Sequence, residues 1–313
     1  MSPARKGARI AMVGALTTLA ALIPAGSASA VTLAGEWAPF TRCPVDAPAM
    51  LAADGATTAP LCLASNSPSG SIKLGSTTAT TGNSDLQFGL ISAGSAGTAA
   101  LVSPSGGAII ADPAPVPGGL LGLMCPSGVP LVSEVCRLAT DNDLNNVTAT
   151  VQQAGALSDF DLAAALAVGR PILTLPVKIH LQNPLLGPDC FIGSEADPIV
   201  LRPKNLAAPT GSFTRFDGDG TRNPTGGVML KIGLSGASQG DDSFAVPGAT
   251  GCGVLGLLSP AIDLKTGLPS PAGDNNLVLD DATTFQGGLN TPRSFAPDAG
   301  QQLSAFWHSA VTS

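Results

Sequence analysis

The sequence predicts a mainly β protein, an antiparallel sandwich or barrel of short strands with a few short helices and disulfide staples. Three observations predict this class. Short stretches alternate between apolar and polar residues, Gly and Pro account for 38 and 27 of the 313 residues, and the six cysteines form an even set. Frequent turns between short alternating stretches favour antiparallel strands over a parallel sheet with connecting helices.

The first 30 residues have the features of a signal peptide. Arg5, Lys6 and Arg9 precede an apolar stretch over Ile10–Ile23, and Ser27–Ala30 provides small residues for cleavage. We expect cleavage after Ala30 and a mature region over 31–313. Because the apolar stretch is short for a membrane helix and no later stretch is longer, we expect no membrane span after cleavage. The sequence therefore predicts a secreted protein, extracellular or associated with the cell wall.

The charge balance of the chain is acidic. The full sequence has 15 Lys and Arg against 22 Asp and Glu, a formal net charge of −7, and the predicted cleavage removes three cations and no anion. An acidic surface disfavours nucleic acid as a partner. Aromatic residues make up only 4% of the chain and Tyr is absent, so a sugar site built on aromatic rings has little material.

The mature region divides by composition at about residue 125. Residues 31–125 are rich in Ala, Ser, Thr, Gly and Pro and predict a loop-rich part, although Leu86, Phe88 and Leu90 alternate as on one face of a strand. Residues 126–313 predict a more regular part. The proline-rich segment 112–119 fits either a stiff linker between two parts or a surface loop.

The clearest strand is predicted over 172–182. Its odd positions are apolar and its even positions are mostly polar, which is the pattern of a half-buried strand. Pro176 has no N–H to donate, so we expect this strand at an edge or beside a bulge. Further strands are predicted over 228–234 and 277–285.

Three helices are predicted in the same part. Leu131, Val135 and Leu138 repeat with helical spacing between two cysteines, and Ser158 is a candidate N-cap for a helix over 159–168. The third runs over 259–266, where a proline stands at the start and Gly267 follows the end.

The six cysteines all follow the predicted cleavage site, and an exported chain favours disulfides over metal binding. Because fifteen pairings exist, sequence alone does not choose among them, but loop closure favours near neighbours. We therefore expect Cys43–Cys62, Cys125–Cys136 and Cys190–Cys252. No Cys-x-x-Cys motif is present, which disfavours zinc.

Four segments carry a resemblance. Leu175–Ser194, Asp197–Leu201, Ser243–Gly253 and Gly267–Gly273 resemble a family of secreted actinobacterial proteins of unknown function, over residues 175–276. The resemblance implies export and a bridge between Cys190 and Cys252. It implies no catalytic residue.

One motif has the spacing of a hydrolase nucleophile. Gly236–Gly240 reads G-A-S-Q-G around Ser238, and Asp263 or Asp280 and then His308 follow in the order of a catalytic triad. The motif requires a helix directly after the serine, whereas acid, proline and glycine residues follow here.

A second motif contains two carboxylates, Asp217 and Asp219, separated by glycine. This spacing can wrap a calcium ion, but Arg222 and Val228 stand where a calcium loop needs glycine and a bidentate acid, so an Asp-Gly turn is favoured. No nucleotide or other cofactor motif is present.

The sequence therefore predicts a secreted or cell-envelope protein that acts as a non-catalytic binding or structural component, with cell-wall material as the candidate partner. Two alternatives stay open. The first is a secreted serine hydrolase using Ser238, with His308 and Asp263. The second is a β-barrel carrier of a small apolar ligand, which requires a cavity between alternating strands.

Overall fold

The structure is a computed structural model that describes residues 31–93, 99–125, 130–140 and 143–312. The predicted signal peptide lies outside the described residues. Residues 31–313 form one compact unit, separate from residues 1–30. Within the described part of the chain, no helix is long and apolar enough to cross a membrane.

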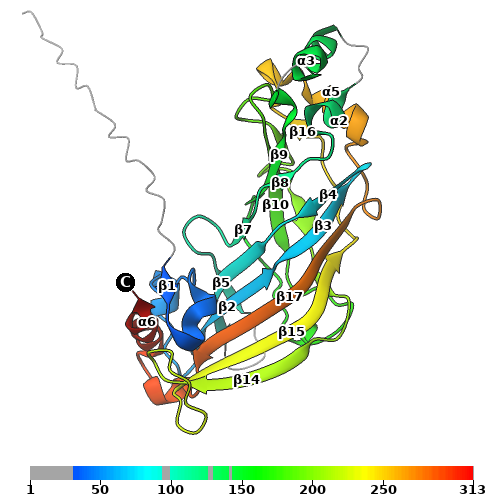
Figure 1. Cartoon of the computed structure of the whole chain (residues 1–313). Helices are drawn as coiled ribbons and strands as arrows, with labels where there is room; N and C mark the ends of the chain where they lie inside the picture. Colours follow the sequence, from blue (N-terminus) through cyan, green and yellow to red (C-terminus); the bar gives the residue numbers. More distant parts are fainter. Residues whose placement is uncertain (1–30, 94–98, 126–129, 141–142, 313) are drawn as a thin grey trace, which may run out of the picture. The chain divides into compact units, whose positions relative to one another are not determined.

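The larger of two sheets contains ten described strands, all antiparallel (Figure 1). Its main order is β13-β15-β17-β2-β5-β6, with β14 beside β15, β3 between β17 and β4, and β7 beside β5. The strands are β2 (Thr58–Ser67), β3 (Ser69–Leu74), β4 (Thr77–Thr81), β5 (Ser84–Ala93), β6 (Ala100–Val102), β7 (Ile109–Ala111), β13 (Lys204–Asn205), β14 (Thr210–Phe216), β15 (Met229–Asp241) and β17 (Asn276–Leu289).

The smaller sheet has the order β16-β11-β10-β9-β8, and β12 also pairs with β10. Its strands are β8 (Ala114–Pro115), β9 (Thr148–Gln153), β10 (Leu175–Gln182), β11 (Phe191–Ile192), β12 (Ile199–Leu201) and β16 (Ala249–Thr250). Near the two ends of the described chain, β1 (Thr32–Leu33) pairs with β18 (Val311–Thr312).

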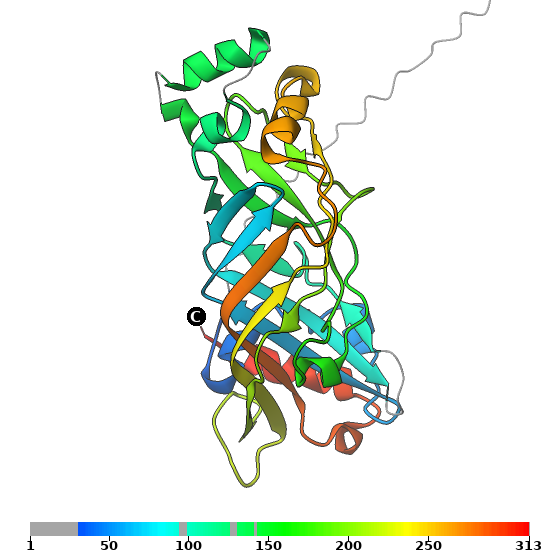
Figure 2. The ribbon, with the colours of Figure 1, turned by 90° about the vertical axis from the view of Figure 1, so that its right-hand side faces the viewer.

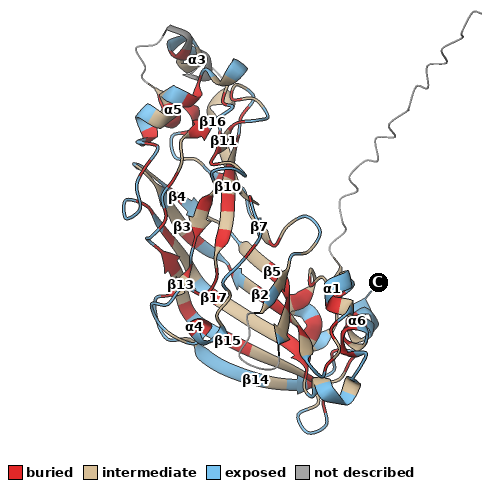
Figure 3. Ribbon diagram, turned by 180° about the vertical axis from the view of Figure 1, so that it is seen from behind, coloured by how far each residue is buried: buried red, intermediate tan, exposed pale blue. Residues whose placement is uncertain are grey.

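The two sheets share one apolar core, which makes the fold a sandwich. Along β10 the odd positions from Leu175 to Leu181 are at most 4% exposed and alternate with partly exposed residues (Figure 3). They belong to the same buried cluster as Phe88 of β5 and Leu277 of β17. The predicted mainly β class is confirmed, and of its two architectures the sandwich is the right one. In the described residues neither sheet closes into a barrel, because β8, at the end of the smaller sheet, pairs only with β9, and β6 and β7 of the larger sheet pair only with β5.

Short helices gather at two ends of this unit (Figures 1 and 2). α2, α3 and α5 lie at one end, and α1 and α6 lie at the other. The α-helices are α1 (Pro48–Leu51), α2 (Gly119–Met124), α3 (Pro130–Thr140), α4 (Leu162–Ala165), α5 (Ser259–Thr266) and α6 (Ala299–Ser309). The 3₁₀ turns are η1 (Gly35–Phe40), η2 (Asp143–Asn145), η3 (Val254–Gly256) and η4 (Pro292–Phe295).

One predicted helix is right and another is wrong in length. α5 follows the predicted 259–266 and ends at Gly267, whose left-handed φ of 71° suits glycine. The helix predicted over 159–168 is reduced to the single turn α4. Asp161, rather than Ser158, caps it by accepting hydrogen bonds from the next backbone N–H groups, because Asp159 has a φ of 55° that interrupts helical geometry.

Of the two positions predicted for the strand of Pro176, the edge of a sheet is wrong. β10 lies between β9 and the strands β11 and β12, so it is not an edge strand. The missing N–H of Pro176 causes little loss because β9 ends at Gln153, just before the position opposite the proline. There the Pro176 carbonyl still accepts a hydrogen bond of 2.9 Å from Ala154 N.

Residues 31–125 contain more regular structure than the sequence predicts. β2 and β5 are ten residues long each, and β2 pairs with β17 from the opposite half of the chain. The proline-rich segment 112–119 contains β8 and leads into α2. Both parts of the mature region thus contribute strands to shared sheets.

Three disulfides join Cys43 to Cys62, Cys125 to Cys136 and Cys190 to Cys252, and no cysteine is free. This is the sequential pairing that loop closure favours. Three disulfides indicate an oxidising, extracellular type of compartment.

Candidate functional site: an apolar cavity and a polar groove

A cavity of about 120 Å³ lies between the two sheets. Both sheets line it, and β10 contributes every inward side chain from Leu175 to Leu181. An engineered cavity of comparable size, lined by aliphatic and aromatic side chains, is known to stay dry and to bind small apolar molecules. The lining residues are Ile72, Leu74, Thr77, Ala79, Thr81, Ser84, Ile109, Ala111, Asp112, Ala114, Val116, Leu123, Ala149, Val151, Leu175, Val177, Ile179, Leu181, Ile192, Ile199, Leu201, Pro203, Thr266, Leu268, Leu277 and Leu279.

The lining is aliphatic apart from a few polar side chains. Thr266 Oγ1 donates a hydrogen bond to the Ile262 carbonyl within α5. Thr81 Oγ1 differs, because this buried oxygen has no hydrogen-bond partner in the described structure. An unpartnered hydroxyl beside an apolar cavity is a place where a polar atom of a ligand can hydrogen-bond.

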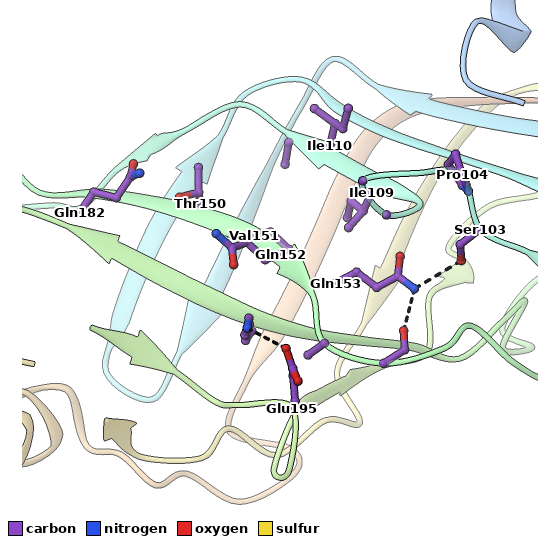
Figure 4. A pocket seen from close by; sticks show the side chains of 16 residues that line it. Ser103, Pro104, Ile109, Ile110, Thr150, Val151, Gln152, Gln153, Gln182 and Glu195 are labelled. Atoms are coloured by element: carbon purple, nitrogen blue, oxygen red, sulfur yellow. Dashed lines mark hydrogen bonds and ion pairs between the residues drawn. The ribbon is translucent and has the colours of Figure 1, made fainter. Parts of the chain in front are cut away.

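A groove of about 880 Å³ lies on the outer side of β9 and β10 (Figure 4). Side-chain amides and a hydroxyl line one wall, among them Thr150, Gln152 and Gln182. The loop from Ser103 to Gly107 and strand β7 form the other wall. Thr150 Oγ1 is a second buried oxygen without a hydrogen-bond partner in the described structure. The groove therefore has several polar side chains in its lining, whereas the lining of the cavity is mainly apolar.

The cavity and the groove meet between the edges of the two sheets, along a line that we call the seam. On this side β8 pairs with β9 only at Thr148 and Ala149, and β7 pairs only with β5. Ile109, Ala111 and Val151 line both the cavity and the groove. Side chains, rather than a row of paired strands, therefore separate the two spaces at the seam.

Gln153 bridges one end of the seam. Its Oε1 accepts a hydrogen bond of 2.7 Å from Ala108 N, next to β7, and its Nε2 donates to the Gly155 carbonyl at 2.7 Å. A longer bond of 3.4 Å reaches Ser103 Oγ in the opposite wall (Figure 4). One side chain thus ties the edge of the smaller sheet to the edge of the larger one.

The groove lining contains one cation and one anion, Lys178 and Glu195. Their Nζ and Oε1 atoms are 3.3 Å apart, and Lys178 Nζ also lies 4.9 Å from the centre of the Phe191 ring. The Glu195 side chain is 79% exposed, so this ion pair is weak and a ligand can replace the carboxylate at Lys178.

The structure does not bring the predicted triad residues together. Ser238 lies within the long strand β15 and is followed by more strand instead of a helix. Asp263 is on α5 and accepts a hydrogen bond from Ala249 N, and burial raises the pKa of its carboxyl against the effect of that bond. His308 is on α6, at the opposite end of the unit from α5 (Figures 1 and 2). Asp280, the other candidate acid, lies in β17.

His308 instead contacts Asp46, with Nε2 2.9 Å from Oδ2. Ser304 Oγ donates to the same carboxylate at 2.6 Å. Burial acts to raise the pKa of Asp46, but the hydrogen bonds from Ser304 and His308 outweigh it and the pKa is lowered. The carboxylate stands between the serine and the histidine, which leaves the hydroxyl without a base to activate it.

Asp217 and Asp219 lie in a turn, where their carboxylates are engaged by the chain itself. Asp217 accepts hydrogen bonds from Asn223 Nδ2 at 2.9 and 3.1 Å, and Asp219 accepts one from Thr221 N at 2.9 Å. Among the described residues, no group of three or more His, Cys, Asp or Glu is arranged to hold a metal ion.

Sequence reasoning foresaw the inward face of β10 but not the cavity it lines. The available signal was the unusually regular alternation of this strand, which is equally compatible with a filled core. No family model, curated protein or solved structure matches this chain. The resemblance to secreted actinobacterial proteins therefore stays a prediction.

Proposed function

We propose that this chain is an exported, non-catalytic binding protein that holds an amphiphilic molecule, with its apolar part in the cavity and its polar end in the groove. The observation that carries the proposal is the wall that the two spaces share at the seam, where Ile109, Ala111 and Val151 line both. Ligand sites are concave, mostly apolar and furnished with a few polar groups, which describes this pair of spaces.

Three features support the division of the ligand into two parts. The cavity is lined mainly by aliphatic side chains, so burying an apolar chain there removes its surface from water at no cost in lost hydrogen bonds. The groove offers amide groups and Lys178 to a polar or anionic end. The seam between them is closed by side chains, which can rotate without breaking a strand pair.

The proposal changes the carrier alternative from the sequence in one respect. The ligand lies between two open sheets rather than inside a closed barrel. A sandwich can admit a chain by separating two sheet edges, whereas a barrel admits it through one end. Three disulfides and the predicted signal peptide support export of such a carrier.

The proposal is tested with the fluorescent fatty acid cis-parinaric acid, of which the apolar end enters the cavity and the rest of the chain lies along the seam and the groove. Two variants change a cavity wall, Ala79→Leu and Ala149→Leu. Both alanines line the cavity, so the added methyl groups occupy ligand space, and we expect affinity to fall by about tenfold or more. Filling the cavity should change the free energy of unfolding by less than about 1.5 kcal/mol.

Ala163→Leu, at an exposed position of α4, is the matched control and should leave affinity unchanged. Absence of saturable binding by the wild-type protein would refute the proposal, as would equal affinities of the cavity variants and the control.

A further inference from the structure

An exposed apolar surface lies at the end of the unit that contains α2 and α5. We call it the tip and define it by Val254, Leu255, Leu257 and Leu264. These side chains are 79%, 94%, 56% and 88% exposed, and three of them fall within four consecutive positions. Single exposed leucines are common, but four large aliphatic side chains together usually mark a binding surface.

The loop that carries the tip is held firmly. Cys252 is fully buried and bonded to Cys190, and Gly253 N donates a hydrogen bond of 2.7 Å to the Leu186 carbonyl. Leu258 N donates to the Cys252 carbonyl at 2.9 Å and closes the loop. The aliphatic side chains are therefore directed outward by a fixed backbone.

Leu255 is exposed on a backbone conformation that is unfavourable for leucine. Its φ and ψ are 53° and 24°, in the left-handed region that residues with a branched aliphatic side chain rarely adopt. Asn or Gly would adopt this backbone conformation more easily than leucine, and neither would expose a large apolar side chain to water. A strained backbone that presents a leucine to solvent is typical of a functional surface.

The occupant that best fits the tip is a lipid surface. No charged residue occurs over 243–262, which includes three of the four tip residues, or over 113–133, and the helices α5 and α2 that these stretches enter pack against each other. Asp263 and Lys265 flank the fourth tip residue, Leu264, and the Asp263 carboxylate accepts a hydrogen bond from Ala249 N. The hot spots of protein interfaces are enriched in Trp, Tyr and Arg, none of which occurs in either stretch. Exposed Lys265 beside Leu264 can lie at the level of the lipid headgroups while the leucine inserts.

The cavity extends to the end of the unit that contains the tip. Thr266 and Leu268, at the end of α5, and Leu123 of α2 line the cavity. Helices α2 and α5, which lie at the same end of the unit as the tip, thus also contribute to the wall of the cavity (Figures 1 and 3).

We infer that the tip docks onto a lipid bilayer by inserting Val254, Leu255, Leu257 and Leu264. Docking places the end of the cavity against the bilayer, where an apolar chain can move between lipid and protein without crossing water. The docking stands on the tip alone, whereas the transfer rests on the proposed function.

The test is flotation of the oxidised unit 31–313 with vesicles of phosphatidylcholine, with and without phosphatidylglycerol. The variant Leu255→Asn/Leu264→Gln replaces two of the four side chains that we expect to insert into the bilayer. Both side chains are exposed, so the core is not disturbed, and asparagine suits the left-handed backbone at 255. We expect vesicle partitioning to fall by about tenfold or more, with no loss of thermal stability.

Leu166→Gln is the matched control. Leu166 is 56% exposed, as is Leu257, but it lies beside α4 and away from α5 (Figure 3). This variant should partition like the wild-type protein.

Two results would overturn the inference. One is equal flotation of the wild-type protein and the tip variant, including no flotation of either. The other is a wild-type dimer that the tip variant abolishes, which would make the tip a contact between copies of this chain. Binding of cis-parinaric acid without vesicles reports on the cavity alone, so failure of docking and failure of the proposed function are distinguishable.

Discussion

Two apolar regions of this protein differ in how well they are filled. One, the aromatic core, packs η1 and α6 against the larger sheet, and there Trp37, Phe40 and Phe216 are fully buried with ring centres 5.9 and 5.5 Å from that of Trp37 in edge-to-face contact. The other is the aliphatic interface between the sheets, which contains the cavity.

The difference teaches which part of the molecule serves stability and which serves binding. Rigid rings with few rotamers fill space completely, and the indole N–H groups of Trp37 and Trp307 are both paired with backbone carbonyls at 2.8 Å. Strands that face each other with Leu, Ile, Val and Ala leave space that small rotamer changes can enlarge.

The largest effect is expected for Trp37→Ala in the aromatic core. Removing this indole leaves a cavity among fully buried neighbours and takes away the shorter of the two hydrogen bonds that the Gly218 carbonyl accepts, so the free energy of unfolding should fall by about 3–5 kcal/mol. Denaturant unfolding with the disulfides intact measures the loss. A loss below about 1.5 kcal/mol would contradict the close packing of this region.

A matched pair of leucine deletions sharpens the comparison. Leu303→Ala in the aromatic core removes a fully buried side chain and should cost about 3–4 kcal/mol. Leu277→Ala borders the existing cavity and has fewer contacts to lose, so it should cost about 2 kcal/mol. Parallel denaturant curves give both values. Equal losses would show that the two regions are equally well packed, and the opposite order would contradict the comparison.

Gln153→Ala tests the seam. Loss of the bond from Ala108 N should reduce the free energy of unfolding by about 1 kcal/mol and increase the association rate of cis-parinaric acid, because the sheet edges separate more easily. Stopped-flow fluorescence measures the rate. Gln301→Ala, at an exposed position of α6 outside the groove, is the control that should leave the rate unchanged.

The smallest effect is expected for Asp46→Asn, at the carboxylate that contacts Ser304 and His308 of α6. A carboxyl whose pKa is lowered in the folded state stabilises the fold above its unfolded pKa of about 3.9, and this contribution is lost as pH falls through the folded pKa. Because the pair with His308 is more than half exposed, the loss at pH 5 should stay below about 1 kcal/mol. Thermal unfolding of both proteins from pH 5 to pH 2 should show the difference disappearing, and a difference that grows in acid would contradict the assignment.

Local patterns predicted the elements that depend on few residues. Three features depend on short stretches of chain and can therefore be predicted from the sequence. They are the alternation in β10, the proline and glycine at the two ends of α5, and the near-neighbour cysteine pairs. The edge-strand prediction for Pro176 failed because a distant segment decided: the proline lies in a central strand, at the point where β9 ends opposite it. The helix predicted after Ser158 failed for a local reason, the left-handed backbone at Asp159, which the residue pattern did not indicate.

The candidate site and the tip, like the position of Pro176, depend on segments that are far apart in the sequence. Gly253–Leu258 reads like a core segment, and only the tertiary structure shows that Val254, Leu255 and Leu257 face solvent. Likewise, the sequence pattern marks Val151 and Ile109 only as strand residues. The tertiary structure shows that both line the cavity and the groove, where two sheet edges meet without pairing.

The sequence by itself determined the mainly β class of this protein and its most regular strands, and it favoured the disulfide pairing that the structure has, because hydrophobic period, turn residues and loop closure act locally. Only the tertiary structure decided that the sheets form a sandwich with a cavity, a seam without strand pairing and an apolar tip. The spacing between two packed sheets depends on the volumes of all the side chains between them, and these come from segments that are far apart in the chain.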